Sequence, residues 1–386
     1  MLWRIPALLG AALCSVLVHA AADTAAFTPL SSLDILPDIC DAPEESPRCR
    51  KASQDACQDA CQDAFDASAM SLCVDALSLP TIGALVDSVD PLIGGRYRLG
   101  ESIGTGTYGE VYSAVDVLSG EEVAIKTERV DALETTLEKE FAVYKTVSGG
   151  EGVPHIKWFG VDGDHRALVL DLLGPSLSQY FHQSDRKMFS LKTVILLADQ
   201  MITRIEHVHS HGLVHHDIKP GNFVMGLGER ASQVYIIDFG SSTLFRDPET
   251  LTHIPYSEDT REEALTRNFR YGSINSHLGV MRTRRDDLEG LAYVWVYWLR
   301  GTLPWFGLRA QKISMRRARI LAKMRSFPVK RLTHSLPDEF AEYIEYTRAL
   351  GFDEEPDYVY LRRLFRDVAA REGFEYDGVF DWTAKR

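Results

Sequence analysis

The chain has 386 residues, of which 45% are hydrophobic and 25% charged, with a formal net charge of −13 at pH 7. This composition is ordinary for a globular protein with a sizeable core, and the length suggests two or three structural units or one large bilobal domain with an extension. Residues 1–96 carry five Lys or Arg against thirteen Asp or Glu, a net of −8, so the remaining 290 residues hold −5 and neither part has the basic excess that predicts nucleic-acid binding.

An apolar leader and all six cysteines lie near the start of the chain. Residues 5–18 are apolar, follow Arg4 and precede the small Ala20 and Ala21, which is the pattern of a secretory signal peptide over residues 1–21. The stretch is too short for a membrane span. Cleavage would leave five cysteines, an odd number, so one would be free or intermolecular. A short buried helix, or upstream sequence that was wrongly included, would give the same pattern.

Residues 22–95 form an acidic, cysteine-containing extension. Its one regularity is a repeat that reads QDAC at 54–57, QDAC at 58–61 and QDAF at 62–65. A four-residue period places Cys57, Cys61 and Phe65 along one side of a helix. Two cysteines are too few for a zinc site, so the repeat predicts a short acidic helix with an apolar stripe.

From Tyr97 onward the sequence predicts a β-rich lobe followed by a helical lobe. One helical segment around residues 133–147 interrupts a series of short β-type runs, of which the clearest are residues 111–117, 122–128 and 167–171. After Gly174 the pattern is mainly helical. The predicted fold class is α+β, with a small β-rich N-lobe over residues 96–175 and a larger α-helical C-lobe over residues 176–383.

Two helices of the second lobe are well marked. Ser190 is the expected N-cap of a long amphipathic helix, whose apolar residues recur at intervals of three and four and which Gly212 ends. Residues 286–300 predict a helix that is apolar almost all round and is therefore buried at the centre of a domain.

A glycine-rich loop lies between two predicted strands. Residues 104–111 follow the pattern G-x-G-x-x-G-x-V, with Gly104, Gly106, Gly109 and Val111 at the fixed positions. Glycines let the backbone close over phosphates without side-chain collision. A hairpin or a dinucleotide-binding loop can look similar, but the dinucleotide loop requires a helix directly after it, and here a strand follows. The pattern therefore favours a loop over the phosphates of ATP.

A lysine and a carboxylate follow this loop in the expected order. Lys126 ends the run VAIK on a predicted strand, seventeen residues beyond Gly109. Its ammonium can reach the α- and β-phosphates if a carboxylate holds it, and Glu140 in the next helical segment is the candidate. Either residue alone is more often a solvated surface charge, but their order and spacing favour a functional pair.

Two further motifs carry the chemistry of phosphoryl transfer. Residues 215–222 read HHDIKPGN, in which Asp217 would orient the substrate hydroxyl and accept its proton. Lys219 would lie near the transferred phosphate, and Asn222 would bind a metal. Asp238 begins a DFG motif sixteen residues later and would bind the Mg²⁺ that bridges the phosphates. Four such elements in this order predict transfer of phosphate from ATP with Mg²⁺.

Beyond these motifs the sequence resembles the casein kinase 1 family of Ser/Thr protein kinases over about residues 97–383. The resemblance rests on LLGPSL (172–177), HIPY (253–256), SIN (273–275, where most kinases have APE), RRDDLE (284–289), LPW (303–305), YLRRLF (360–365) and FDW (380–382). It implies the bilobal protein kinase fold and phosphorylation of serine or threonine in protein substrates with acidic or phosphorylated motifs. We expect a monomer.

The resemblance also implies roles for individual residues. Asp171 and Leu173, at the connection between the lobes, would contact ATP. The family's anion site maps to the side chain of Arg270, the backbone at Gly307 and the side chain of Arg316. Arginine suits phosphate because its fork donates two parallel hydrogen bonds. Other basic residues surround Arg316, so a solvated helix face is the alternative there.

Departures from the family pattern leave two alternatives open. His216 stands where His-Arg-Asp has its arginine, and Asn268 stands where the family usually has Thr, in a stretch that is longer than usual. Both would fit a pseudokinase that binds nucleotide or phosphopeptide without turnover, although the residues assigned to catalysis, ATP and metal are intact. The leader would place the chain in the secretory pathway, whereas the resemblance predicts the cytoplasm or nucleus.

Overall fold

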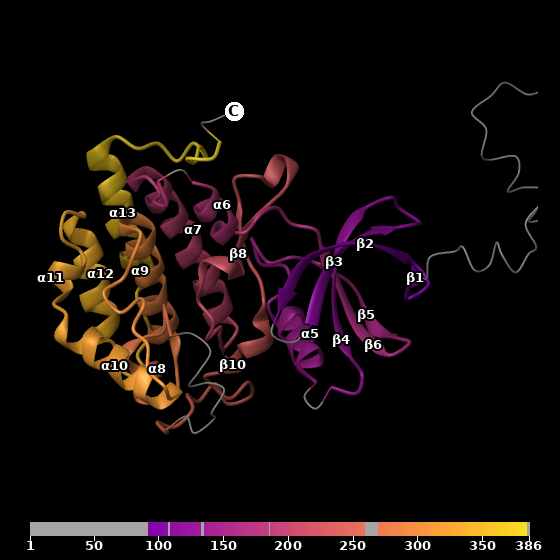
Figure 1. Cartoon of the computed structure of the whole chain (residues 1–386), viewed down its shortest axis with the longest axis horizontal. Helices are drawn as coiled ribbons and strands as arrows, with labels where there is room; N and C mark the ends of the chain where they lie inside the picture. The colour runs from indigo at the N-terminus through magenta and orange to yellow at the C-terminus, as the bar shows by residue number, and fades with distance from the viewer. Residues whose placement is uncertain (1–91, 107–108, 133–134, 185, 259–268, 384–386) are drawn as a thin grey trace, which may run out of the picture. The chain divides into compact units, whose positions relative to one another are not determined.

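The computed structural model describes residues 92–383, except 107–108, 133–134, 185 and 259–268, and only the backbone at 105–106. The predicted leader, residues 22–91 of the acidic extension with its cysteines, and Asn268 lie outside the described residues. The first part of the described chain is an antiparallel sheet and the second part is mostly helical (Figure 1), which confirms the predicted α+β fold class. No helix within the described residues has both the length and the apolar character needed to cross a membrane.

The sheet has the strand order β1-β2-β3-β4-β6-β5. Its strands are β1 (Leu92–Ile93), β2 (Tyr97–Gly106), β3 (Gly109–Asp116), β4 (Glu122–Arg129), β5 (Ile156–Asp162) and β6 (His165–Asp171). Successive side chains of a strand point to opposite faces. In β6, Ala167 and Val169 pack with Tyr97 in a small cluster on one face. Leu168 and Leu170 of the same strand join the large core on the other face.

Helix α5 (Thr136–Thr146) contacts β4, β5 and β6 of the sheet and is capped by a strand residue. The carboxylate of Glu128 on β4 accepts hydrogen bonds from the backbone N–H groups of Thr136 (2.9 Å) and Leu137 (3.2 Å). A negative charge is favourable at a helix N-terminus, where backbone N–H groups have no partner in the helix. The helix predicted around residues 133–147 is confirmed, and this contact fixes its start.

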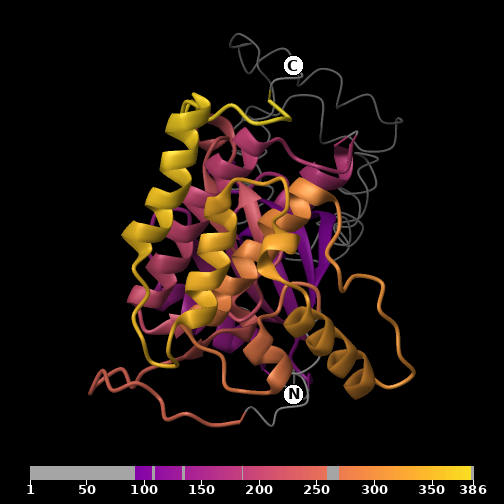
Figure 2. The same cartoon turned by 90° about the vertical axis from the view of Figure 1, so that its left-hand side faces the viewer.

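Helices α7 (Leu191–Ser210), α9 (Arg284–Arg300) and α13 (Tyr358–Glu372) form the centre of the second part, where α7 packs against both of the others. Figures 1 and 2 show the yellow α13 beside the magenta α7. The hydroxyl of Ser190 accepts a hydrogen bond from the N–H of Thr193 (3.2 Å), and Gly212 follows the helix with φ of 79°. Both predicted ends of α7 are therefore confirmed.

Helix α9 is buried, as its apolar sequence predicts, but it begins two residues before the predicted residue 286. A carboxylate oxygen of Asp286 accepts a hydrogen bond from the N–H of Thr283 (2.7 Å) and caps the first turn. The helix therefore includes Arg284 and Arg285, whose guanidinium groups donate hydrogen bonds to the backbone carbonyl oxygens of Asp353 (2.7 Å) and Leu350 (2.8 Å). These pairings let two charged residues lie in a buried turn.

Two short strand pairs hold the sequence motifs of the site. The pairs are β7 (Leu213–Val214) with β10 (Thr243–Leu244) and β8 (Phe223–Met225) with β9 (Val234–Ile236). The HHDIKPGN motif runs from β7 to β8 and the DFG motif runs from β9 to β10, so the strand pairs bring the two motifs together. The other helices are α6 (Leu177–Gln183), α8 (Ile274–Leu278), α10 (Ile313–Ser326), α11 (Val329–Leu332) and α12 (Asp338–Ala349).

Candidate active site

Lys126 joins the sheet, helix α5 and the DFG motif through its ammonium group. The Nζ atom lies 2.6 Å from Oε2 of Glu140 on α5 and 3.1 Å from Oδ1 of Asp238. Burial alone would lower the pKa of Lys126, but the two carboxylates raise it above its ordinary value. The ammonium therefore stays charged, and it is fixed where a strand, a helix and a loop meet.

The DFG motif is also held by α5. The hydroxyl oxygen of Tyr144 accepts a hydrogen bond from the N–H of Asp238 (3.3 Å), and its ring packs edge-on against Phe239 with 4.8 Å between centroids. Tyr144 lies four residues after Glu140, so both side chains point to the same side of the helix. Burial would raise the pKa of Asp238, but Lys126 and Lys219 lower it below its ordinary value. This carboxylate is therefore ionised.

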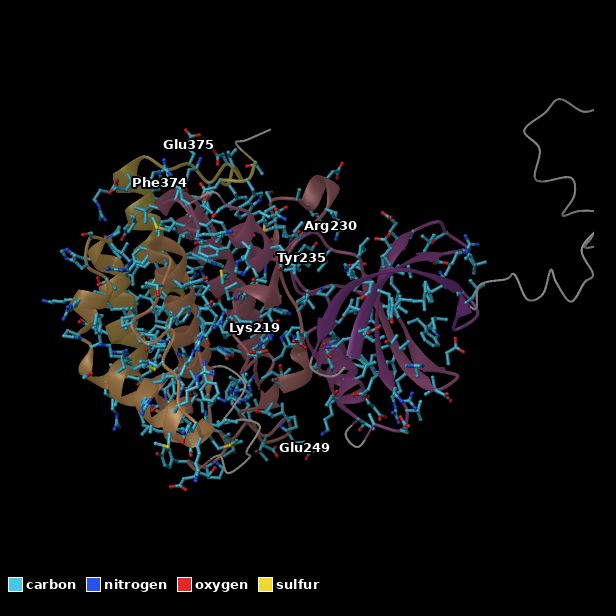
Figure 3. All side chains as sticks on the ribbon, in the orientation of Figure 1. Lys219, Arg230, Tyr235, Glu249, Phe374 and Glu375 are labelled. Atoms are coloured by element: carbon cyan, nitrogen blue, oxygen red, sulfur yellow. The ribbon has the colours of Figure 1, made fainter. Side chains whose placement is uncertain are left out.

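Asp217, Lys219 and Asn222 form a compact group at the end of β7. The Nζ atom of Lys219 lies 2.5 Å from Oδ2 of Asp217 and 3.9 Å from Oδ2 of Asp238. The amide nitrogen of Asn222 donates to the backbone carbonyl of Asp217 (2.9 Å) and to its Oδ2 (3.2 Å). Figure 3 shows Lys219 on the side of the helical part that faces the sheet. Lys219 thus connects the group to Asp238.

Asp287, buried in α9, holds the backbone of the catalytic loop. Its carboxylate accepts hydrogen bonds from the N–H groups of His215 (2.7 Å) and His216 (2.9 Å). The ring of His209 lies 3.1 Å from the same carboxylate and 2.7 Å from the hydroxyl of Tyr358. Burial opposes ionisation, but the hydrogen bond from His209 helps to lower the pKa of Asp287 to about 2. No role was assigned to this residue from the sequence, although it lies in the charged motif RRDDLE at the start of a helix that is largely apolar after it.

The glycine-rich loop has two kinds of glycine. A Cβ atom at Gly109 would lie 1.8 Å from the carbonyl oxygen of Thr127 on β4, so the close approach of two strands requires glycine there. A Cβ atom at Gly104 would meet no atom of the described chain closer than 4.0 Å, so no close contact within the described residues requires glycine there. The backbone register pairs Gly104 with Val111 and Gly106 with Gly109.

Asn222 and Asp238 fit the binding of a magnesium ion. Their side chains offer a carboxamide and a carboxylate oxygen, which are the hard ligands that Mg²⁺ prefers. Asn222 donates through its amide nitrogen, which leaves the carbonyl oxygen for a metal. Within the described residues no group of three or more His, Cys, Asp or Glu could hold a metal alone. Such a sparse set suits Mg²⁺, which usually keeps waters and takes further ligands from substrate phosphates.

Asp171 and Leu173 lie at the connection between the two parts, where sequence reasoning placed ATP contacts. The carboxylate of Asp171 accepts a hydrogen bond from the N–H of His155 (2.9 Å) and lies 3.1 Å from Nζ of Lys157. This side chain therefore ties β6 to the start of β5, and a contact with ATP would come from its main chain. Leu173 is half-buried. Contacts of both residues with ATP stay predictions.

The three residues expected at the anion site line one hollow. A hollow of about 450 Å³ has Arg270, Gly307 and Arg316 in its wall. Arg316 is half-buried, and its guanidinium lies 5.1 Å from the ring centroid of Phe269, so it is not simply a solvated helix residue. A second hollow of about 400 Å³ joins Arg270 and Arg316 to Lys219. Binding of an anion there stays a prediction.

The sheet and the helical part, joined at Lys126 and Asp238, define a bilobal phosphotransferase. A family model, the protein kinase domain, matches residues 97–343. This chain belongs to the protein kinase family. Its members bind ATP with a divalent metal and transfer phosphate to protein substrates.

Proposed function

We propose that this chain is an active Ser/Thr protein kinase of the casein kinase 1 type, which acts as a monomer on acidic or phosphate-primed proteins. The observation that carries the proposal is the contact of Lys126 with both Glu140 (2.6 Å) and Asp238 (3.1 Å). Kinase activity requires this lysine and its helical glutamate to be paired while the DFG aspartate is in place. The pairing favours the active enzyme over the pseudokinase alternative.

The charges and the contacts of the site residues support a role for each of them in phosphoryl transfer. Asp217 accepts the proton of the substrate hydroxyl, and its hydrogen bonds to Asn222 and Lys219 fix its orientation. Lys126 supplies positive charge at the α- and β-phosphates, and Lys219 supplies it near the transferred phosphate. Asn222 and Asp238 would hold Mg²⁺, which supplies further charge neutralisation of the phosphates when bound.

Two motifs that carry the family resemblance contact each other. The hydroxyl of Ser273, in Ser-Ile-Asn, donates a hydrogen bond to Asp286 (2.5 Å) and accepts one from the N–H of Ser276 (3.0 Å). Asp286 lies in the motif RRDDLE on α9. Because each motif holds the other in place, they support a single assignment to the casein kinase 1 type.

The hollows support a preference for anionic substrates. Lys219, Arg270 and Arg316 line one continuous wall, and the indole N–H of Trp305 donates to the backbone carbonyl of Arg270 (2.8 Å). A phosphate or carboxylate near the phosphoacceptor would meet both arginines there.

We further infer the domain boundaries and the location of the chain. The N-lobe comprises residues 96–175 and the C-lobe residues 176–383, and the short strand β1 just before them also pairs with the N-lobe sheet. A leader over residues 1–21 with the pattern of a signal peptide and an acidic extension over residues 22–95 precede the two lobes. A functional leader directs the chain to the secretory pathway, whereas the family resemblance places it in the cytoplasm or nucleus. Sequencing the N-terminus of the native protein distinguishes the two.

Transfer of labelled phosphate from ATP to dephosphorylated casein tests the catalytic proposal. We expect Mg²⁺-dependent labelling of casein, with the label on serine and threonine, and no labelling of a copolymer of glutamate and tyrosine. Label on tyrosine would contradict the assignment to Ser/Thr kinases. Binding of ATP without any transfer would instead support the pseudokinase alternative.

A further inference from the structure

A strongly basic segment follows α9. Between Gly301 and Pro337 the sequence has nine Lys or Arg and no Asp or Glu, in a chain whose net charge is −13. The segment comprises the loop after α9, helix α10 and the short α11, drawn in orange in Figures 1 and 2. Cations gathered in one segment produce a positive potential that attracts anionic ligands.

The two hollows connect this segment with the catalytic loop. One hollow reaches Lys219 and the other reaches Arg309, and both have Phe269, Arg270 and Arg316 in their walls. A substrate whose hydroxyl lies near Lys219 can therefore extend past the two shared arginines towards Arg309. The second hollow has more room than one anionic group needs, and Arg309 is a further cation in its wall.

Arg309 lies on a loop that α10 holds in place. The guanidinium of Arg319 donates a hydrogen bond to the backbone carbonyl of Arg309 (2.6 Å). Arg319 lies three residues after Arg316, so the two point to neighbouring positions on the helix. The side chain of Arg309 is exposed, and within the described part of the chain neither Arg309 nor Arg319 forms an ion pair with a carboxylate. Its charge is therefore available to a ligand.

We propose that Arg309 binds a second anionic group of the substrate, beyond the group held by Arg270 and Arg316. The inference rests on the proposed function and names its substrate class: peptides with two acidic or phosphorylated residues in series on the same side of the phosphoacceptor. Arg309 is solvent-exposed, and exposed ion pairs are weak, so the second group improves affinity by about two- to fivefold and does not govern the rate of transfer.

The test uses the full chain and three sets of synthetic peptides that share one phosphoacceptor serine. One set has no phosphoserine, one has a single phosphoserine, and one has a second phosphoserine displaced stepwise away from the acceptor. We expect the second phosphate to lower KM by about two- to fivefold at one spacing, with kcat unchanged. Arg309→Ala abolishes this gain and leaves KM for the singly phosphorylated peptide within about twofold of the wild-type value. Arg309→Glu makes the doubly phosphorylated peptide worse than the singly phosphorylated one.

Arg325→Ala is the matched control, because Arg325 is an exposed arginine on α10 that lines neither hollow. We expect this variant to have the wild-type KM and kcat for all three peptide sets. Fluorescence anisotropy measures binding of the same labelled peptides without ATP and so separates this inference from the proposed function. If the chain binds the peptides in a manner that depends on Arg309 but transfers no phosphate, the proposed function is contradicted and the inference is not. Equal losses on singly and doubly phosphorylated peptides in Arg309→Ala, or an equal loss in Arg325→Ala, would overturn the inference and indicate a general attraction to polyanions.

Discussion

The imidazole Nε2 of His216 lies 2.6 Å from the hydroxyl oxygen of Thr243. His216 takes the position of the arginine in His-Arg-Asp, and its backbone has φ of 69°, a region that L-residues rarely adopt. Contacts of its ring with Thr243, of its N–H with Asp287 and of its carbonyl oxygen with a guanidinium nitrogen of Arg282 (2.8 Å) help to keep it there. Thr243 begins β10 and lies near the start of the predicted activation segment, residues 241–270. The contact therefore ties this segment to the catalytic loop, residues 215–222, without any phosphate.

We therefore expect activity to be independent of phosphorylation of the activation segment. Histidine is not a permanent cation at pH 7, so His216 cannot replace arginine in binding a phosphorylated loop. Treatment with a phosphatase, followed by its removal, leaves kcat unchanged, and His216→Arg changes kcat by less than about tenfold, or about 1.4 kcal/mol. Loss of most wild-type activity, or rescue of an inert wild type by His216→Arg, would contradict this and favour the pseudokinase alternative.

Asp217→Asn should abolish most turnover without unfolding the protein. The amide has nearly the same shape as the carboxylate, but it cannot accept the proton of the substrate hydroxyl, so we expect kcat to fall by at least about 10²-fold. Affinity for ATP stays within about threefold, because Lys126, Asn222 and Asp238 are intact. Unchanged phosphorylation of casein by the folded variant would show that Asp217 has another role.

Arg270→Ala should distinguish primed from unprimed substrates. A hydrogen bond to a charged group contributes roughly 1.5–3 kcal/mol, so kcat/KM for a singly phosphorylated peptide should fall by about ten- to a hundredfold. The loss on unprimed acidic peptides should be smaller. Lys330→Ala is the control, since this exposed cation lines neither hollow. Equal losses on both kinds of peptide in Arg270→Ala would mean that its side chain is structural.

The parts of the site that lie in short motifs could be predicted from the sequence. Contacts between residues that are far apart in the sequence could not, because no local pattern links the two partners. The partner of Lys126 could be named because Glu140 is only fourteen residues away, on the next helix. Asp287 is more than seventy residues from the backbone groups it holds, so no local pattern connects it with His215. Neither did the sequence show that Glu128, an acid in a β-type run, would turn inward to cap α5.

Glu128→Ala tests that cap. Loss of a cap costs about 1–2 kcal/mol, and here the backbone N–H groups of Thr136 and Leu137 would be left buried without an acceptor. We expect the free energy of unfolding in urea to fall by about 2 kcal/mol, with a rise in KM for ATP because α5 also carries Glu140. Glu138→Ala removes an exposed acid from the same first turn and should cost less than about 0.5 kcal/mol. Equal effects of the two substitutions would contradict the cap.

His277 should make the protein less stable as pH falls below neutrality. It lies on α8, stacked on Phe269 of the hollow walls with 6.2 Å between ring centroids. Burial, assisted by Arg317, lowers its pKa to about 4. In the unfolded chain a histidine has a pKa of about 6.5, so between these values the unfolded state binds more protons and stability rises with pH. The free energy of unfolding therefore rises by about 3 kcal/mol between pH 4 and pH 6.5 on account of His277, and this rise is complete above pH 6.5. We expect His277→Phe, which keeps an aromatic ring, to flatten the dependence of the unfolding free energy on pH between 4 and 6.5. If His277→Phe left the pH dependence of the unfolding free energy unaltered, the pKa of His277 would not be lowered in the folded protein.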